Sequence, residues 1–196
     1  MGEGWVVPSL NGHNLRAVVP AAGLSRRFGP QNKLLQPYGD STVVGTVVRV
    51  LRDAGLPVIV VTGHEAQQVS AACPGADAVF NPHYEEGMGT SVACGVKHAL
   101  PCDGIMIVLA DMPGLTGSTV GRLISAFDGH PERIVAVRYA AEPGRIGHPI
   151  VFGSAHHGAL SALRGDVGAR DLLREWRDRI VWVDCDGGLA DIDVPS

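Results

Sequence analysis

The sequence predicts a single α/β domain over residues 1–196, in which helices cover both faces of a mostly parallel sheet. Strand-like and helix-like segments alternate along most of the chain, and this alternation is typical of parallel strands joined by crossover helices. The run IMIVLA at residues 105–110 has no polar side chain, as expected for a central strand buried on both faces. A chain of 196 residues is long enough to bury a full core in one such domain. The expected architecture is a Rossmann-like three-layer sandwich.

The first half of the chain gives three predicted strands and two predicted helices. Residues 1–14 lack a clear periodicity and are expected to be a loose lead-in. A β-branched strand at residues 17–19 precedes a glycine-rich loop, and Ser41 is expected to cap a helix over residues 42–54 that Gly55 ends. Apolar residues of that helix recur at helical spacing: Val43, Val47, Val50 and Leu51. The remaining elements here are strands at 57–61 and 78–80, with helical spacing at Ala66, Val69 and Cys73 between them.

The second half continues the alternation. A polar loop at residues 81–91 opens a helix whose apolar stripe is Val92, Val96, Ala99 and Leu100. The central strand is expected over residues 104–109. The next helix carries Val120, Leu123, Ile124 and Phe127 at the i, i+3, i+4, i+7 spacing. The last predicted elements are strands at 134–139 and 149–152, short helices at 156–163 and 169–176, and a strand at 180–183.

Composition excludes several functional classes. The formal net charge is −4 and the pI is near 6, which argues against nucleic acid as the main partner. No apolar run is long enough to cross a bilayer, and the amino terminus lacks the basic start and apolar stretch of a signal peptide. The four cysteines show no C-x-x-C spacing. We therefore expect reduced, structural thiols in a cytoplasmic protein.

The segment VVPAAGLSRRFGPQNKLL, residues 18–35, is the strongest candidate for ligand binding. From residue 4 to residue 39 there are four basic residues and no acidic residue, against the sign of the whole chain. Glycines in this loop let the backbone approach a ligand closely, and successive amides can form a concave anion site. The side chains that would add to such a site are Ser25, Arg26, Arg27 and Lys33. This combination favours a polyphosphate over an ordinary solvated basic loop.

Two well-known phosphate motifs do not fit this loop. A dinucleotide fingerprint would need G-x-G-x-x-G after the first strand and an acidic residue at the end of the next strand; the chain has no such glycine pattern there, and the next strand ends at Val61 and Thr62. A Walker loop would need Gly-Lys followed by Ser or Thr, which is also missing. These two classes of phosphate site are therefore excluded for this loop.

Asp111 is the best candidate for a metal ligand. It follows the apolar central strand, where a carboxylate serves as a turn cap or as a ligand. Because ligands of parallel sheets bind beyond the carboxyl ends of the strands, Asp111 and the basic loop are expected at the same edge. Mg²⁺ is usually held by one or two carboxylates together with phosphate oxygens of the substrate. Asp191 and Asp193, two apart near the end of the chain, are either further ligands or part of an acidic solvated tail.

The loop GMGTS at residues 87–91 is the third candidate. Free amides and hydroxyls at the start of a helix suit a phosphate or the polar edge of a base, although an ordinary N-cap formed by Thr90 explains the same residues. His148, in GRIGHPIVF, either contacts a substrate or is structural.

Together these motifs resemble, in order and over nearly the whole chain, the MobA-like nucleotidyltransferases. VVPAAGLSRRFGPQNKLL is similar to the family signature L-A-A-G-x-S-x-R-x-G-x-x-K, and NPHYEEGMGTSV, VLADMPGLT, GHPIVF, GDVGARDLL and DIDVP continue the match. The molybdenum cofactor cytidylyltransferases (MocA-like) resemble it most. Pro20 stands where the family usually has Leu, and Tyr84 stands where Trp is common.

The resemblance implies the fold of the nucleotide-diphospho-sugar transferases and a role for several residues. Ala21, Ala22 and Gly23 would contact the base and ribose through their backbone, and Ser25, Arg26, Arg27 and Lys33 would bind the triphosphate. Gly89, Thr90 and Ser91 would line the base and ribose. Asp111, with Asp193 opposite, would hold Mg²⁺, and His148 would lie on the acceptor side.

The activity implied is transfer of an NMP from an NTP to a phosphate-bearing acceptor, with Arg27, Lys33 and Asp111 as the catalytic residues. CTP is favoured and GTP is possible, and the acceptor is a pterin-type cofactor or a sugar phosphate, with a molybdoenzyme as a further partner. Two alternatives stay open. The first is a nicotinamide-dependent oxidoreductase, and the second is a nucleotide-binding maturation partner without turnover.

Overall fold

The protein is built around one seven-stranded sheet. The computed structural model describes residues 12–24, 31–140, 146–166, 172–173 and 176–185. The strand order is β5-β4-β1-β6-β8-β7-β9. The strands are β1 Leu15–Pro20, β4 Val58–Thr62, β5 Asp77–Phe80, β6 Gly104–Ile107, β7 Ile134–Tyr139, β8 Gly147–Gly153 and β9 Ile180–Cys185. Only β8 among them runs antiparallel to its neighbours β6 and β7.

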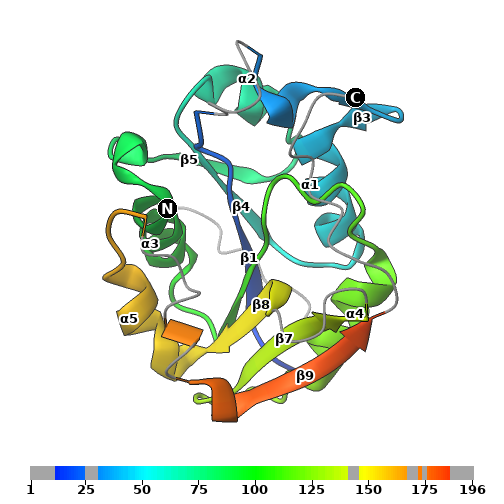
Figure 1. Ribbon diagram of the computed structural model, residues 1–196, viewed down its shortest axis with the longest axis vertical. Helices are drawn as coiled ribbons and strands as arrows, with labels where there is room; N and C mark the ends of the chain where they lie inside the picture. The colour runs from blue at the N-terminus through cyan, green and yellow to red at the C-terminus, as the bar shows by residue number, and fades with distance from the viewer. Residues whose placement is uncertain (1–11, 25–30, 141–145, 167–171, 174–175, 186–196) are drawn as a thin grey trace, which may run out of the picture.

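Helices cover both faces of this sheet (Figure 1). On one face lie α1 Val43–Asp53, α2 Ala66–Ala71 and α4 Gly117–Ala126, whose apolar side chains pack in one core cluster with the sheet. On the other face, α3 Met88–Ala99 and α5 His157–Ser161 form a second cluster with the opposite side chains of the strands. This division confirms the predicted mostly parallel three-layer sandwich.

The antiparallel strand β8 was not predicted from the alternating pattern. The connection from Tyr139 to Gly147 is too short for a crossover helix, since a parallel crossover needs about a dozen residues or more. The chain therefore turns back and inserts β8 between β6 and β7. As a result, the start of β8 lies beside the carboxyl end of β6.

Other differences are local. A small hairpin forms from β2 Pro37–Tyr38 and β3 Ser41–Thr42. Thr42 rather than Ser41 caps α1, and its Oγ1 accepts from the amide of Gly45 at 3.1 Å. The strand β6 ends at Ile107, two residues before the expected end. The helix expected at 156–163 begins as a 3₁₀ turn, Ser154–His156, before α5. The lead-in at residues 1–11 and most of the helix expected at 169–176 lie outside the described residues.

The contact of α3 with the sheet depends on a glycine. A Cβ on Gly95 would lie 2.4 Å from Cγ1 of Val18 and 2.8 Å from Cγ2 of Val61, both of which are fully buried. Because overpacking forces backbone and side-chain shifts, we expect Gly95→Ala to lower the free energy of unfolding by about 1–3 kcal/mol. Urea denaturation measures this change.

Gly121, in α4, is the matched control. A Cβ there would meet nothing within 4 Å, so Gly121→Ala should raise stability by about 0.5–1 kcal/mol through helix propensity alone. Equal stability of Gly95→Ala and the wild type would show that α3 does not pack as closely as described.

The described cysteines are free thiols. Burial raises the pKa of Cys73 to about 12 and that of Cys102 to about 11, which disfavours the reactive thiolate at neutral pH. Among the described residues, no helix combines the length and apolar character that a membrane crossing requires.

Candidate active site

The sheet reverses its winding direction at β1. From β1 the chain passes through α1 to β4 on one side, and from β5 it passes through α3 on the opposite face to β6 on the other side. Ligands of open α/β sheets bind in the crevice outside the carboxyl ends of the strands at such a switch point. The segments that follow β1 and β6 border this crevice, and they contain Lys33 and Asp111.

Lys33 and Asp111 form an ion pair across the crevice. The Nζ atom of Lys33 lies 2.5 Å from Oδ2 of Asp111, although 78 positions separate them in the sequence. The two side chains are 23% and 19% exposed. The prediction that Lys33 and Asp111 lie together at one edge of the sheet is therefore confirmed. Their roles in binding and catalysis stay predictions.

Local structure holds each partner in place. Lys33 begins the 3₁₀ helix η1 Lys33–Leu35, which buried Asn32 caps by accepting from the amide of Leu34 at 3.0 Å. Asp111 lies in the turn after β6, and the next residue, Met112, is buried. Leu34, next to Lys33, and Met112, next to Asp111, are buried and anchor the two segments. Binding of a ligand would therefore cost little conformational entropy of the protein at these positions.

The loop after β1 is partly fixed by β4. The amide of Ala21 donates to the carbonyl of Val61 at 2.8 Å, and the carbonyl of Ala22 accepts from the amide of His64 at 3.3 Å. Gly23 is exposed, and a Cβ there would meet nothing within 4 Å. No steric contact among the described residues therefore explains a glycine at this position. Ser25, Arg26 and Arg27 lie outside the described residues.

Asn81 organises the start of α3, a role that the sequence reading missed. Its amide nitrogen donates to Oγ1 of Thr90 at 2.9 Å and to Oγ of Ser91 at 3.0 Å, and its Oδ1 accepts from the amide of His83 at 3.0 Å. Asn81 is 2% exposed. The signal was available, because a polar side chain directly after the strand ending at Phe80 stands at the carboxyl edge of the sheet.

These bonds already occupy groups of Thr90 and Ser91 that were expected to contact a nucleotide, and the amide of Gly89 is occupied as well. The hydroxyls of Thr90 and Ser91 are buried against Asn81 rather than presented to solvent. The amide of Gly89 donates to the carbonyl of Gly165 at 2.8 Å. The helix begins at Met88 with Gly87 as its N-cap, so Thr90 lies within the first turn and is not the cap. Participation of these three residues in nucleotide binding stays a prediction.

Loss of the Asn81 hydrogen bonds should lower the stability of the protein. In Asn81→Ala, the Ser91 hydroxyl and the His83 amide lose a buried partner, and leaving such groups unpaired costs about 1–3 kcal/mol, while the Thr90 hydroxyl keeps its bonds to the carbonyls of His83 and Gly87. Urea unfolding should therefore show a lower midpoint. Gln67→Ala, on the exposed side of α2, removes an amide without this network and should leave the midpoint nearly unchanged. Equal midpoints for both variants would contradict the network.

His148 lies at the same edge of the sheet, at the start of β8. Its Nδ1 atom is 3.3 Å from the carbonyl oxygen of Ile107, the last residue of β6, and its own carbonyl accepts from the hydroxyl of Tyr139 at 2.8 Å. A Cβ on Gly147 would lie 2.7 Å from the Tyr139 ring, so the glycine permits this close packing. A contact between His148 and an acceptor stays a prediction.

Asp111 is the candidate metal ligand among the described residues. No cluster of three or more His, Cys, Asp or Glu side chains that could hold a metal ion occurs within the described part of the chain, and Asp193 lies outside that part. Mg²⁺ is commonly bound by one or two carboxylates plus phosphate oxygens and water. The chemistry of Asp111 therefore suits a metal shared with a triphosphate.

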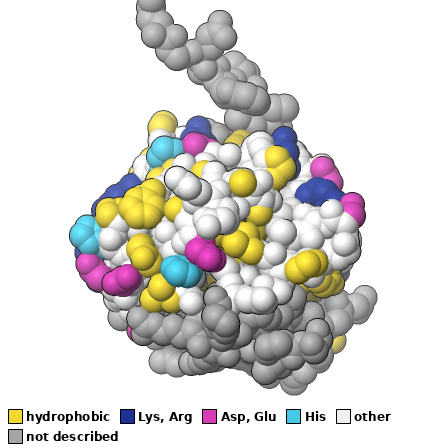
Figure 2. Space-filling model, turned by 90° about the horizontal axis from the view of Figure 1, so that it is seen from above, with side chains coloured by type: hydrophobic (Ala, Val, Ile, Leu, Met, Phe, Trp, Pro, Cys, Tyr) yellow, Lys and Arg dark blue, Asp and Glu magenta, His cyan; other side chains and the backbone are white. Residues whose placement is uncertain are grey.

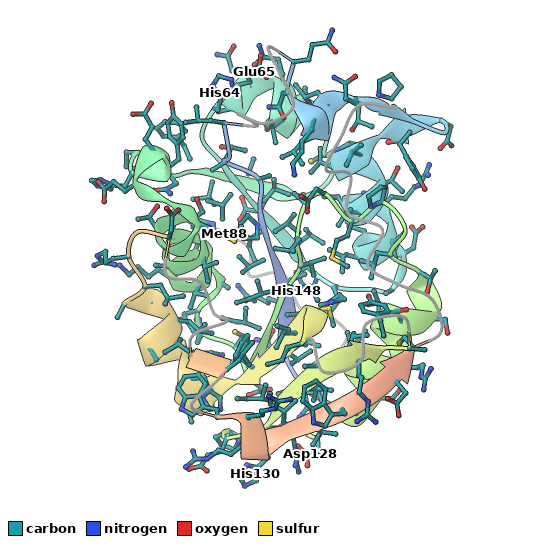
Figure 3. All side chains as sticks on the ribbon, in the orientation of Figure 1. His64, Glu65, Met88, Asp128, His130 and His148 are labelled. Atoms are coloured by element: carbon teal, nitrogen blue, oxygen red, sulfur yellow. The ribbon has the colours of Figure 1, made fainter. Side chains whose placement is uncertain are left out.

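The surface around this end of the molecule carries both signs of charge. Figure 2 looks from above onto the upper end of Figure 1, and its described basic, acidic and histidine side chains lie interspersed with hydrophobic ones. The described side chains form no continuous basic field there, as a nucleic-acid backbone would require. Asp128 and His130 lie at the opposite end from His64 and Glu65 (Figure 3) and are not part of this site.

The protein is an open α/β sheet with a charged pair at its switch point, and comparison with known proteins gives the family. Residues 17–180 match the MobA-like NTP transferase domain. The chain is 33% identical to nicotine blue oxidoreductase of Paenarthrobacter nicotinovorans in an alignment of 190 positions that covers 91% of each chain. The protein belongs to the MobA-like NTP transferase family, as the sequence motifs predicted.

Solved structures agree with this assignment. Rv0371c of Mycobacterium tuberculosis H37Rv is 33% identical, with a TM-score of 0.81 over 92% of this chain and 93% of that chain. A complex of Rv0371c with manganese is 32% identical over 93% and 90% of the two chains, with a TM-score of 0.71. A nucleotidyl transferase from Methanothermobacter is 25% identical over 93% of both chains, with a TM-score of 0.79.

Proposed function

We propose that the protein transfers an NMP from an NTP to a phosphate-bearing acceptor and releases pyrophosphate. CTP is the favoured nucleotide and GTP the second choice. The acceptor is a pterin-type cofactor such as molybdopterin, in keeping with the MocA-like motifs, and a sugar phosphate is the alternative. The observation that supports this function most is the Lys33–Asp111 pair at the switch point of the sheet.

The pair provides complementary charges for a metal-bound triphosphate. In the free protein each charge compensates the other across 2.5 Å. When a triphosphate carrying Mg²⁺ binds, Lys33 would pair with the phosphates instead of Asp111, and Asp111 would pair with Mg²⁺ instead of Lys33. The exchange leaves no partly buried charge unpaired, which would otherwise be costly.

The reaction requires positioning and charge neutralisation more than covalent catalysis. An oxygen of the acceptor phosphate attacks the α-phosphorus in line, the bond from that phosphorus to the bridging oxygen breaks, and the electron pair leaves with pyrophosphate. Lys33 and Arg27 neutralise the charge that grows on the leaving group, with Ser25 and Arg26 as further phosphate contacts. Because the nucleophile is already an anion, no general base is needed.

The metal, Mg²⁺, would be held by Asp111, with Asp193 as the second carboxylate, and would stabilise the developing charge as a Lewis acid. The related complex with manganese supports the use of a divalent ion. His148 lies on the acceptor side, at the start of β8.

The other predicted residues would hold the nucleoside. Ala21, Ala22 and Gly23 would contact base and ribose through their backbone, and the open space where a Cβ of Gly23 would stand suits close approach of a ligand. Gly89, Thr90 and Ser91 would form the opposite wall, with their position fixed by Asn81. We place the protein in the cytoplasm, where a molybdoenzyme would receive the modified cofactor.

Two experiments test this function. Thermal shift with CTP, GTP, ATP and UTP, each with and without Mg²⁺, should show a metal-dependent shift for the preferred nucleotide, since ligand binding to the native state raises stability as ln(1 + [L]/Kd). Pyrophosphate release should then require both that nucleotide and molybdopterin. Absence of any nucleotide-dependent shift would overturn the proposal.

The name of the relative nicotine blue oxidoreductase favours one alternative, a nicotinamide-dependent oxidoreductase. This alternative predicts that NADPH competes with CTP and that tryptophan fluorescence reports its binding. A maturation partner without turnover would instead bind the Mg²⁺–nucleotide and release no pyrophosphate with any acceptor.

A further inference from the structure

Glu65 has an unusual backbone conformation. Its φ and ψ of 50° and 41° place it in the left-handed region, and it is the one residue other than glycine with a positive φ among those the structure describes. A side chain with a Cβ is strained in this region. Residues held in such conformations occur preferentially at functional sites, where the surrounding structure maintains them.

The side chain of Glu65 adds a second anomaly. Its Oε2 atom is buried, and no hydrogen-bond donor in the described chain reaches it. Its backbone carbonyl, by contrast, is paired normally with the amide of Val69 at 3.0 Å. The residue as a whole is half-buried, and an acceptor oxygen buried without a donor destabilises the protein. Neither feature of Glu65 improves the stability of the fold.

The position of Glu65 relates it to the proposed nucleotide site. It lies just beyond β4, and in the sheet β4 stands between β1 and β5. The loop is pressed between the segments that follow those strands, since a Cβ on Gly63 would lie 2.8 Å from Cβ of Ala22 and 2.5 Å from Cγ of Tyr84. Figure 3 shows His64 and Glu65 together at this end of the molecule.

We propose that Glu65 is a specificity-determining residue that selects the nucleobase. This inference rests on the proposed function, in which the base lies between Ala21–Ala22–Gly23 and Gly89–Thr90–Ser91. In that arrangement, the loop after β4 would line the base between these two segments. The unpaired carboxylate oxygen accepts a hydrogen bond from an amino group on the base edge. Among pyrimidines it selects cytosine, whose N4 is a donor, over uracil, whose O4 is an acceptor and meets the carboxylate with repulsion.

CTP and UTP are suitable probes because they differ only at this edge. Isothermal titration calorimetry with Mg²⁺ should show that the wild type prefers CTP. In Glu65→Gln, whose amide offers both a donor and an acceptor, the CTP-to-UTP affinity ratio should fall at least about tenfold, which corresponds to the loss of one discriminating contact of about 1.4 kcal/mol. Glu85→Gln, an exposed position in the neighbouring loop, makes the same change of charge and should leave the ratio unchanged.

A second variant separates this role from a structural one. Glycine adopts the left-handed conformation without strain, so Glu65→Gly should raise the melting temperature of the free protein while abolishing the preference for CTP. A lower melting temperature with an unchanged CTP-to-UTP ratio would show that Glu65 is structural and would overturn the proposal. An unchanged ratio in both variants would overturn it as well.

Failure of this inference differs from failure of the proposed function. If the wild type binds CTP and UTP but substitutions at Glu65 do not change their ratio, only the role of Glu65 is wrong. If the wild type binds CTP selectively through Glu65 but releases no pyrophosphate with any acceptor, the transfer reaction is wrong and the role of Glu65 stands.

Discussion

Asp111→Asn should reduce pyrophosphate release by about 10³-fold or more, because removing a group that stabilises transition-state charge has effects of at least 10²–10³. The substitution keeps the shape of the side chain and removes its charge, so it weakens the metal ligand without opening a cavity. Asp111 lies in a turn and pairs with Lys33 in a partly exposed bridge. Because the pair is only partly exposed, we expect the free energy of unfolding to fall by about 1–3 kcal/mol, and circular dichroism of the variant checks that it is folded under the assay conditions.

The assay is a coupled pyrophosphate measurement at saturating nucleotide and acceptor. Asp128→Asn makes the same substitution at the opposite end of the molecule (Figure 3) and should retain wild-type turnover. Normal pyrophosphate release by Asp111→Asn would rule out the proposed mechanism, whatever the nucleotide or acceptor.

Lys33→Ala should mainly weaken nucleotide binding. Loss of a hydrogen bond to a charged group costs about 1–3 kcal/mol, which is an increase of about 5- to 150-fold in Kd. The effect should depend on the phosphate chain, so affinity for CTP should fall more than affinity for CMP. Calorimetric titration of both nucleotides measures this difference directly.

Lys97, near the end of α3 and exposed, is the other lysine of the chain and provides the control. Lys97→Ala changes the net charge equally and should leave both affinities intact. Equal loss for CTP and CMP in Lys33→Ala would mean that Lys33 supports the fold of the loop rather than the phosphates.

Much of the fold could be predicted because the hydrophobic pattern is strong. The strand β7 has the bounds that its apolar run predicted, and α4 carries its expected apolar stripe on the buried face. Sheet order and strand direction required more than periodicity. The antiparallel direction of β8 results from the short connection after β7, which the hydrophobic pattern does not show. The strands of the β2–β3 hairpin are too short to give a periodic signal.

The candidate site could be predicted where topology alone brings residues together. Parallel strands place their carboxyl ends at one edge, so Lys33 and Asp111 were expected to meet. The roles of Asn81 and Glu65 depend on which hydrogen-bond partners the folded chain supplies and on one backbone dihedral. The sequence shows that Asn81 follows a strand, but the hydrogen bonds of Asn81 and the backbone dihedral of Glu65 are not encoded in local residue spacing, so three-dimensional contacts were needed to find them.

In the proposed reaction, the Lys33–Asp111 pair exchanges its internal contact for a metal-bound triphosphate. The most direct measurement is Mn²⁺ binding, followed by electron paramagnetic resonance of the free ion, with and without a non-hydrolysable CTP analogue. We predict tight Mn²⁺ binding by the protein–nucleotide complex and its loss in Asp111→Asn. Equal retention of Mn²⁺ by Asp111→Asn and the wild type in the presence of the nucleotide would contradict the claim.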